Sequence, residues 1–150
     1  MNSCERELAD AVKQLGLSTS QFSKCEPPQA DDVARTAKVR FVTGNPRVWW
    51  LGFQQPYETF PYDSLDDWAR RLSGVIPHGT ARCWLIAEST TETYPVYDVQ
   101  VESIVAVLKE CSFFEYFLVD PAFKWIVADT DHNQLLVARP IDEKKSRGRA

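Results

Sequence analysis

The chain has 150 residues, of which 44% are hydrophobic and 25% are charged, a composition typical of one folded domain and not of a disordered chain. No apolar run approaches the ~18 residues that a membrane-spanning helix needs, and the charged N-terminal segment lacks the apolar stretch of a secretory signal. These features predict a soluble, cytoplasmic protein. The four cysteines are scattered without metal-binding spacing, which predicts free, partly buried thiols.

The net charge of −4 is distributed unevenly along the chain. Residues 58–131 carry thirteen acidic and five basic side chains, whereas residues 1–57 and 132–150 are each net positive. Such an acidic region repels nucleic acid and anionic membranes and attracts basic proteins. We therefore expect a basic protein partner, no nucleic acid and no membrane. The alternative is that the acidic surface only confers solubility.

Two helices are expected in the N-terminal third. Residues 3–15 have apolar side chains at helical spacing, and Gly16 is placed to end that helix. The second helix is expected at residues 29–42, before a Gly-Asn-Pro sequence that would end it. The polar segment between these two helices is predicted to be a loop.

The middle of the chain alternates between strand and helix signals. Ser64 can cap a helix over residues 64–75, with Asp67 as its capping-box partner, and Asp98 can cap another over residues 98–111. Strands are expected from β-branched and aromatic runs at 47–53, 82–88 and 94–97.

Residues 113–138 form the densest apolar stretch and predict three consecutive strands. With a tight turn at Pro121 and Ala122, Leu118 would pair with Trp125 in an antiparallel meander. The fold class that follows is α+β: a single domain over residues 1–140, with a mostly antiparallel sheet packed against helices. The charged residues 141–150 are expected to be a disordered tail.

The two faces of this predicted meander differ. One face is unbroken and is expected to pack against helices 64–75 and 98–111; it carries Phe114, Tyr116, Leu118, Phe123, Trp125 and Val127. The other face mixes Glu115 and Lys124 with apolar residues such as Phe117 and Ile126. That mixed face is either a binding surface or is covered by the N-terminal helices.

The polar break at residues 129–133 is interpreted as a turn, since Asp and Asn side chains stabilise turns through local hydrogen bonds. Asp129, Asp131 and His132 could be read as metal ligands, but they lack the spacing of an EF-hand loop. We therefore expect no metal and no cofactor. No nucleotide-binding or hydrolase motif occurs, so catalysis is the alternative hypothesis: a small enzyme that uses Glu115 with the Asp129–His132 loop.

Several motifs together resemble a family of small, uncharacterised proteins found mainly in bacteria. The motifs are Trp49-Trp50, Glu110-Cys111, the Phe-Phe-Glu-Tyr sequence at 113–116, Trp125 and His132-Asn133, and the resemblance covers about residues 47–138. It implies a single-domain protein of the immunity or antitoxin kind, which neutralises a toxin by stoichiometric binding. It supplies no catalytic residues. The chain has Asp-Thr-Asp before His132 where the family pattern has Glu-Asn, so no role is carried over to that loop.

The expected function is therefore a small, cytoplasmic protein-binding module that takes a basic partner. The expected contact residues are acidic groups that steer the partner and two apolar anchors. They are Asp63, Asp66, Asp67, Glu88, Glu92, Glu115, Phe117 and Ile126.

Overall fold

The structure, a computed structural model, describes residues 2–88 and 93–141. The predicted disordered tail lies outside these ranges except for Ile141, whose N–H donates to the carbonyl of Arg40 (2.8 Å). None of the helices in the described ranges combines the length and the hydropathy that crossing a bilayer requires.

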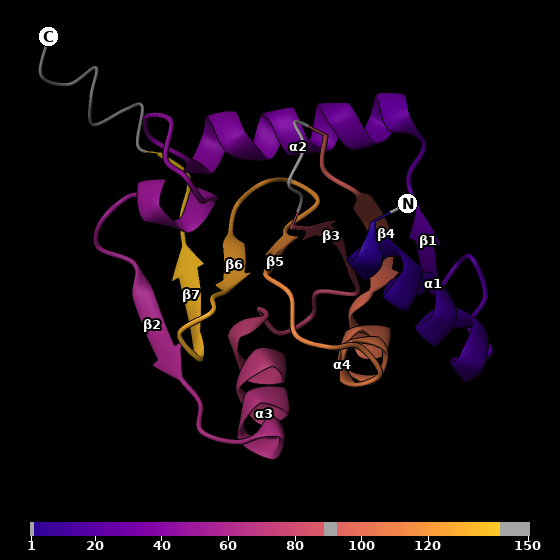
Figure 1. The fold of residues 1–150 in the computed structure, drawn as a ribbon. Coiled ribbons are helices and arrows are strands. Elements are labelled where there is room, and N and C mark those ends of the chain that lie inside the picture. The colour runs from indigo at the N-terminus through magenta and orange to yellow at the C-terminus, as the bar shows by residue number, and fades with distance from the viewer. Residues whose placement is uncertain (1, 89–92, 142–150) are drawn as a thin grey trace, which may run out of the picture.

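A seven-stranded antiparallel sheet lies between two layers of helices (Figure 1). The strands are β1 (Phe22–Lys24), β2 (Glu58–Pro61), β3 (Arg82–Ala87), β4 (Val96–Gln100), β5 (Tyr116–Val119), β6 (Ile126–Asp129) and β7 (Gln134–Ala138), in the spatial order β1-β4-β3-β5-β6-β7-β2. The helices are α1 (Ser3–Leu15), α2 (Pro27–Phe41), α3 (Leu65–Val75) and α4 (Val101–Lys109), with a 3-10 turn, η1, at Trp49–Gly52. The predicted α+β class, with a C-terminal meander packed on helices, is confirmed.

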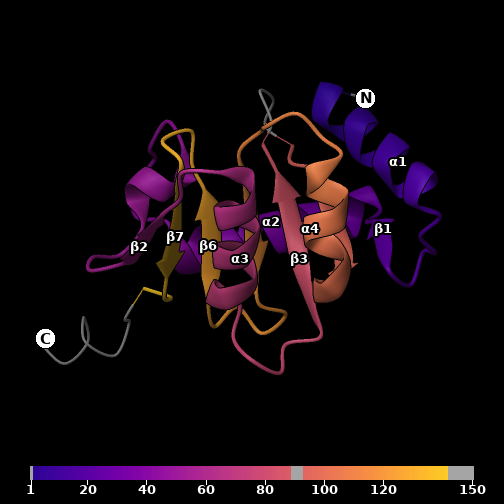
Figure 2. The same cartoon turned by 90° about the horizontal axis from the view of Figure 1, so that it is seen from below.

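Strand alternation divides the core into two clusters. On the side of α1, α3 and α4, Leu72 and Ile104 pack against strand residues such as Leu118. On the other side, Phe41 of α2 packs in one cluster with Phe117 and with other strand residues that alternate with the first set. Seen from below, α3 and α4 lie in front of the sheet and α2 passes behind it (Figure 2).

The mixed face of the meander is covered by α2, which corrects two predicted partner contacts. Phe117 is only 5% exposed and Ile126 is fully buried. Both lie in the cluster formed with α2 and the 3-10 turn, where Trp49 stacks on Phe117 at 5.0 Å between ring centroids. Of the two alternatives for this face, cover by an N-terminal helix is therefore the one observed, and these side chains cannot anchor a partner.

The predicted strand at residues 47–53 is wrong, because this segment forms the 3-10 turn. Its close approach to the end of α2 depends on Gly52, whose carbonyl accepts from the N–H of Thr43 at 2.7 Å. A Cβ on Gly52 would lie 2.6 Å from the carbonyl oxygen of Thr43. The turn places Trp49 in the core below α2.

The predicted register between β5 and β6 is displaced by two residues. Leu118 pairs with Val127 rather than Trp125, because the connection runs through residues 120–125 instead of a two-residue turn. A displacement of two keeps every strand side chain on its predicted face. Trp125 accordingly lies on the face covered by α3 and α4 and is 8% exposed. Phe123, in the longer loop, packs instead on the face covered by α2.

The predicted cap of α3 is present and that of α4 is not. Ser64 accepts from the N–H of Asp67 at 3.0 Å, although the Asp67 carboxylate accepts from the N–H of Asp63 rather than returning to Ser64. Asp98 lies inside β4, where it pairs with Arg82 at 2.9 Å, so the fourth helix begins after Gln100.

Candidate functional site

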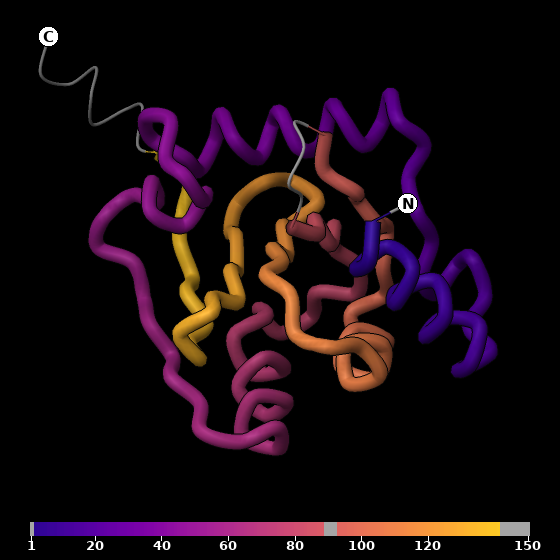
Figure 3. The backbone as a smooth tube through the Cα atoms, in the orientation of Figure 1, coloured from indigo at the N-terminus to yellow at the C-terminus, as the bar shows by residue number. Residues whose placement is uncertain are grey.

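Two concave regions meet at the connection between α4 and β5. This connection, residues 110–115, leaves the end of α4 and runs up to the start of β5 (Figure 3). Phe113 and Phe114 line both concavities. We call the one toward α3 the aromatic pocket, of about 330 Å³, and the one toward Trp50 the acidic pocket, of about 480 Å³.

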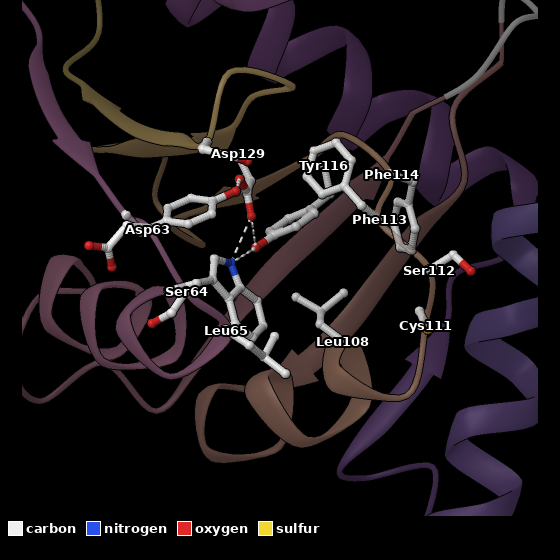
Figure 4. A pocket seen from close by; sticks show the side chains of 13 residues that line it. Asp63, Ser64, Leu65, Leu108, Cys111, Ser112, Phe113, Phe114, Tyr116 and Asp129 are labelled. Atoms are coloured by element: carbon white, nitrogen blue, oxygen red, sulfur yellow. Dashed lines mark hydrogen bonds between the residues drawn. The ribbon is translucent and has the colours of Figure 1, made fainter.

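The wall of the aromatic pocket contains a buried carboxylate, that of Asp129. Its Oδ1 accepts from Tyr62 Oη at 2.7 Å, and its Oδ2 accepts from Tyr116 Oη at 2.7 Å and Trp68 Nε1 at 2.8 Å (Figure 4). Asp129 itself is only 2% exposed. Three donors from separate segments therefore converge on one carboxylate in the wall of the pocket.

Burial sets the protonation behaviour of this group. It raises the pKa of Asp129 above its ordinary value, although the three hydrogen bonds act in the opposite direction. Burial also raises the pKa of Tyr62 and of Tyr116, and the Asp129 charge raises both further. Both phenols are therefore un-ionised at neutral pH and serve as donors. Within residues 2–88 and 93–141, no Lys, Arg or His nitrogen lies within 4.0 Å of the Asp129 carboxylate.

Sequence reasoning assigned Asp129 to a turn and missed this network. The donors Tyr62 and Trp68 are 67 and 61 positions away, and no local pattern connects them to the end of β6. Strand alternation could nevertheless have indicated the position of Asp129. The alternation that places Trp125 and Val127 on the face covered by α3 and α4 places Asp129 on that face as well. The turn that was expected follows directly, with Thr130 N–H donating to the carbonyl of Gln134 and Asn133 at φ 55°.

The acidic pocket brings together three carboxylates from separate segments. Glu88 follows β3, Glu115 precedes β5 and Asp131 lies in the turn after β6. Glu88 Oε2 accepts from the backbone N–H of Glu115 at 2.9 Å, and Trp50 Nε1 donates to Glu115 Oε2 at 3.4 Å. Arg47 is the one basic residue among the described side chains that line this pocket.

Glu115 is the electrostatically strained member of this group. Burial raises its pKa, and the nearby charges of Asp131 and Glu88 raise it further, against the lowering effect of the Trp50 indole. In the part of the chain that the structure describes, no basic nitrogen lies within 4.0 Å of the Glu115 carboxylate. The pocket therefore holds negative charge that a cation from outside would stabilise.

The remaining acidic residues of the predicted contact set are divided. Asp63 lines the aromatic pocket, whereas Asp66 is exposed near the start of α3 and lines neither pocket. Asp67 forms ion pairs with Arg70 and Arg71, which compensate its charge within the helix. Glu92 lies outside the described residues.

The residues of the alternative enzyme hypothesis are only partly brought together. Glu115 and Asp131 share the acidic pocket, and the exposed ring of His132 meets Trp50 edge-on at 5.9 Å between centroids. Asp129 instead faces the aromatic pocket. Within residues 2–88 and 93–141, no three His, Cys, Asp or Glu side chains are arranged to hold a metal ion.

The thiols beside the pockets are poor nucleophiles. Burial raises the pKa of Cys111, which lines the aromatic pocket, to about 11. Burial, followed by the charge of Glu5, also raises the pKa of Cys4, which lines the acidic pocket. A thiolate is the reactive form of cysteine, so neither side chain is activated at neutral pH.

Sequence comparison identifies a protein family, but one whose function is unknown. The sequence model of a family of unknown function, DUF6756, matches residues 3–147, which include the two N-terminal helices as well as the region with the recognisable motifs. No curated protein and no solved structure matches the chain significantly.

Proposed function

The chain belongs to the DUF6756 family of unknown function, and we propose that it is a binding protein for a basic segment of another protein. The observation that carries this proposal is the convergence of Glu88, Glu115 and Asp131 in one concavity without a compensating cation at Glu115. The charges of Glu88 and Asp131 raise the pKa of Glu115, so keeping Glu115 ionised beside them costs free energy in the isolated protein. A lysine or arginine of a partner would relieve that cost on binding.

An apolar anchor adjoins these carboxylates. Phe113 is 57% exposed although it lines both pockets. Exposed aromatic side chains beside a charged concavity are typical of the contacts that dominate protein interfaces. Phe113 is therefore the anchor in this proposal, in place of the predicted anchors Phe117 and Ile126, which are buried.

The expected mode of action is stoichiometric binding. The acidic pocket steers the basic segment and accepts its cationic side chain, while Phe113 contributes apolar contact area and slows dissociation. Neutralisation of a basic toxin in a bacterial cytoplasm is the specific form of this proposal that the family resemblance supports. Binding is favoured over catalysis because Asp129 and Glu115 face different pockets and the nearby thiols have raised pKa values.

The experiment is a quantitative affinity capture with matched charge variants. Wild-type protein, the triple variant Glu88→Gln, Glu115→Gln, Asp131→Asn, and a control triple variant would be immobilised at equal density and exposed to lysate of the native host. The control, Asp10→Asn, Glu26→Gln, Asp31→Asn, removes the same charge from exposed positions outside both pockets. The proposal requires a basic protein that is captured by the wild type and the control and lost from the pocket variant. Equal capture by all three, or capture of an acidic protein, contradicts it.

A further inference from the structure

The aromatic pocket carries chemistry that the proposed partner surface does not use. Its lining includes the rings of Tyr62, Trp68, Phe113, Phe114 and Tyr116, and Phe114 meets Tyr116 edge-on at 6.0 Å between ring centroids. Figure 4 shows Asp129 at one side of the pocket and the side chains of Leu65 and Leu108 at the opposite side. A volume of about 330 Å³ is at the lower end of the range of small-molecule sites, which is ~300–1,000 Å³.

The charged side chains that line this pocket are all acidic among the described residues. Asp63 at the rim and Asp129 in the wall are both acidic, and no basic side chain is among the described residues that line the pocket. A carboxylate has about four acceptor positions, and the three neutral donors occupy three of those of Asp129. Its negative charge is stabilised by hydrogen bonds, but no basic side chain among the described lining residues neutralises it.

We propose that the aromatic pocket binds an organic cation: an ammonium or guanidinium group carried on an apolar stem. The faces of aromatic rings attract cations, and this attraction is stronger where water is excluded. The Asp129 carboxylate adds a longer-range Coulomb attraction, while the apolar stem contacts Leu65 and Leu108. The Asp129 charge repels an anion, and a neutral apolar ligand leaves that charge uncompensated while displacing the remaining water.

Phe113 and Phe114 line both pockets, but the charged groups of this inference differ from those of the proposed protein-binding function. Asp129 and Leu65 line only the aromatic pocket, whereas Glu88, Glu115 and Asp131 do not line it. Variants of the two sets therefore separate the two hypotheses. The cation itself has two possible sources, a free amine and a lysine side chain presented by a polypeptide.

Calorimetric titration with matched probe pairs distinguishes charge from shape. Choline is compared with 3,3-dimethylbutan-1-ol, its uncharged isostere, and a blocked Gly-Lys-Gly peptide is compared with the same peptide carrying norleucine. We expect at least one cation to bind at least tenfold more tightly than its neutral counterpart. Preference for choline identifies a free amine as the ligand class, and preference for the lysine peptide identifies a side chain.

Two variants and one control locate the site. Asp129→Asn removes the charge in the wall, and Leu65→Lys places a competing cation at an exposed rim position; each should weaken cation binding at least tenfold. Leu51→Lys makes the same change at a leucine that is 53% exposed and lines neither pocket, and it should bind like the wild type. Leu65→Lys keeps the test decisive if Asp129→Asn fails to fold. Absence of binding by every cation at millimolar concentration, equal binding of the neutral isosteres, or undiminished binding by Leu65→Lys would overturn the inference.

Discussion

Trp68 in α3 donates its indole N–H to Asp129 at the end of β6, across 2.8 Å and 61 positions of sequence. The same carboxylate accepts from Tyr62, just before α3, and from Tyr116, its cross-strand neighbour in β5. One buried charge thus joins the start of a helix to two central strands. The Asp129 side chain also lines the aromatic pocket. The same carboxylate therefore connects elements of the fold and forms part of the candidate site.

The first prediction concerns the contribution of these donors to stability. Tyr116→Phe removes a single oxygen and leaves the Asp129 charge with two donors, so the free energy of unfolding should fall by about 1.5–3 kcal/mol, the range for hydrogen bonds to charged groups. Urea denaturation measures this change. Tyr97→Phe is the matched control, because Tyr97 is 4% exposed but does not touch Asp129. A loss no greater at Tyr116 than at Tyr97 would show that the network does not stabilise the fold.

The second prediction concerns pH. The pKa of Glu115 is raised above its ordinary value of 4.5, first by burial and then by Asp131 and Glu88. Between the ordinary and the raised value the folded state binds more protons than the unfolded state, so stability increases as pH falls through this window. Glu115→Gln should therefore stabilise the protein at neutral pH by about 0.2–1 kcal/mol, and this advantage should shrink as pH approaches the ordinary value.

Thermal and urea unfolding at neutral and mildly acidic pH test this second prediction. Glu58→Gln, at an exposed position in β2, is the control for loss of one negative charge. Destabilisation by Glu115→Gln at neutral pH, or an advantage that grows on acidification, would contradict the direction of the pKa shift.

The third prediction concerns two glycines. Gly52→Ala would place a Cβ 2.6 Å from the Thr43 carbonyl oxygen, so the turn or the end of α2 must move, at a cost of about 1–3 kcal/mol. Gly74→Ala in α3 meets nothing within 4 Å and should instead stabilise the protein by about 0.5–1 kcal/mol. Chemical denaturation of both variants checks the contrast. Similar effects of the two substitutions would show that the contact at Gly52 is not tight.

The fourth prediction concerns thiol reactivity. Burial raises the pKa of Cys25 and of Cys111 to about 11 and that of Cys83 to about 12, so all three are protonated at neutral pH. Alkylation by iodoacetamide, followed by mass spectrometry, should be much slower than alkylation of free cysteine. Rapid, selective modification of Cys111 at neutral pH would indicate an activated thiol and would favour the enzyme hypothesis.

Periodicity and capping were sufficient to predict much of the fold. The apolar spacing and Ser64 located α3, and strand alternation assigned Leu118 and Trp125 to the face covered by α3 and α4. These patterns are local, because the helix period and the strand pleat are set by residues close together in the sequence. Predictions based on them therefore agree with the structure. The β5–β6 register was displaced because the length of a connection is not fixed by the strands on either side of it.

The candidate site was less predictable for a physical reason. Charge alone predicts Glu88 and Glu115 as contact residues, whereas only the fold brings them into one pocket with Asp131. The aromatic run at 47–53 has strand propensity, but packing of Trp49 on Phe117 forms a 3-10 turn instead. Tertiary contacts of this kind leave no local pattern in the sequence.

The most direct test of the central proposal is the salt dependence of association between this protein and the captured basic partner. Stopped-flow mixing or surface plasmon resonance would give kon and koff for the wild type, the Glu88/Glu115/Asp131 variant and the control variant. If the acidic pocket receives the partner, kon of the wild type falls steeply from low to physiological salt while koff changes little, and the pocket variant loses most of this dependence. A partner that binds with the same kon at all salt concentrations, or equally well to the pocket variant, would contradict the proposal.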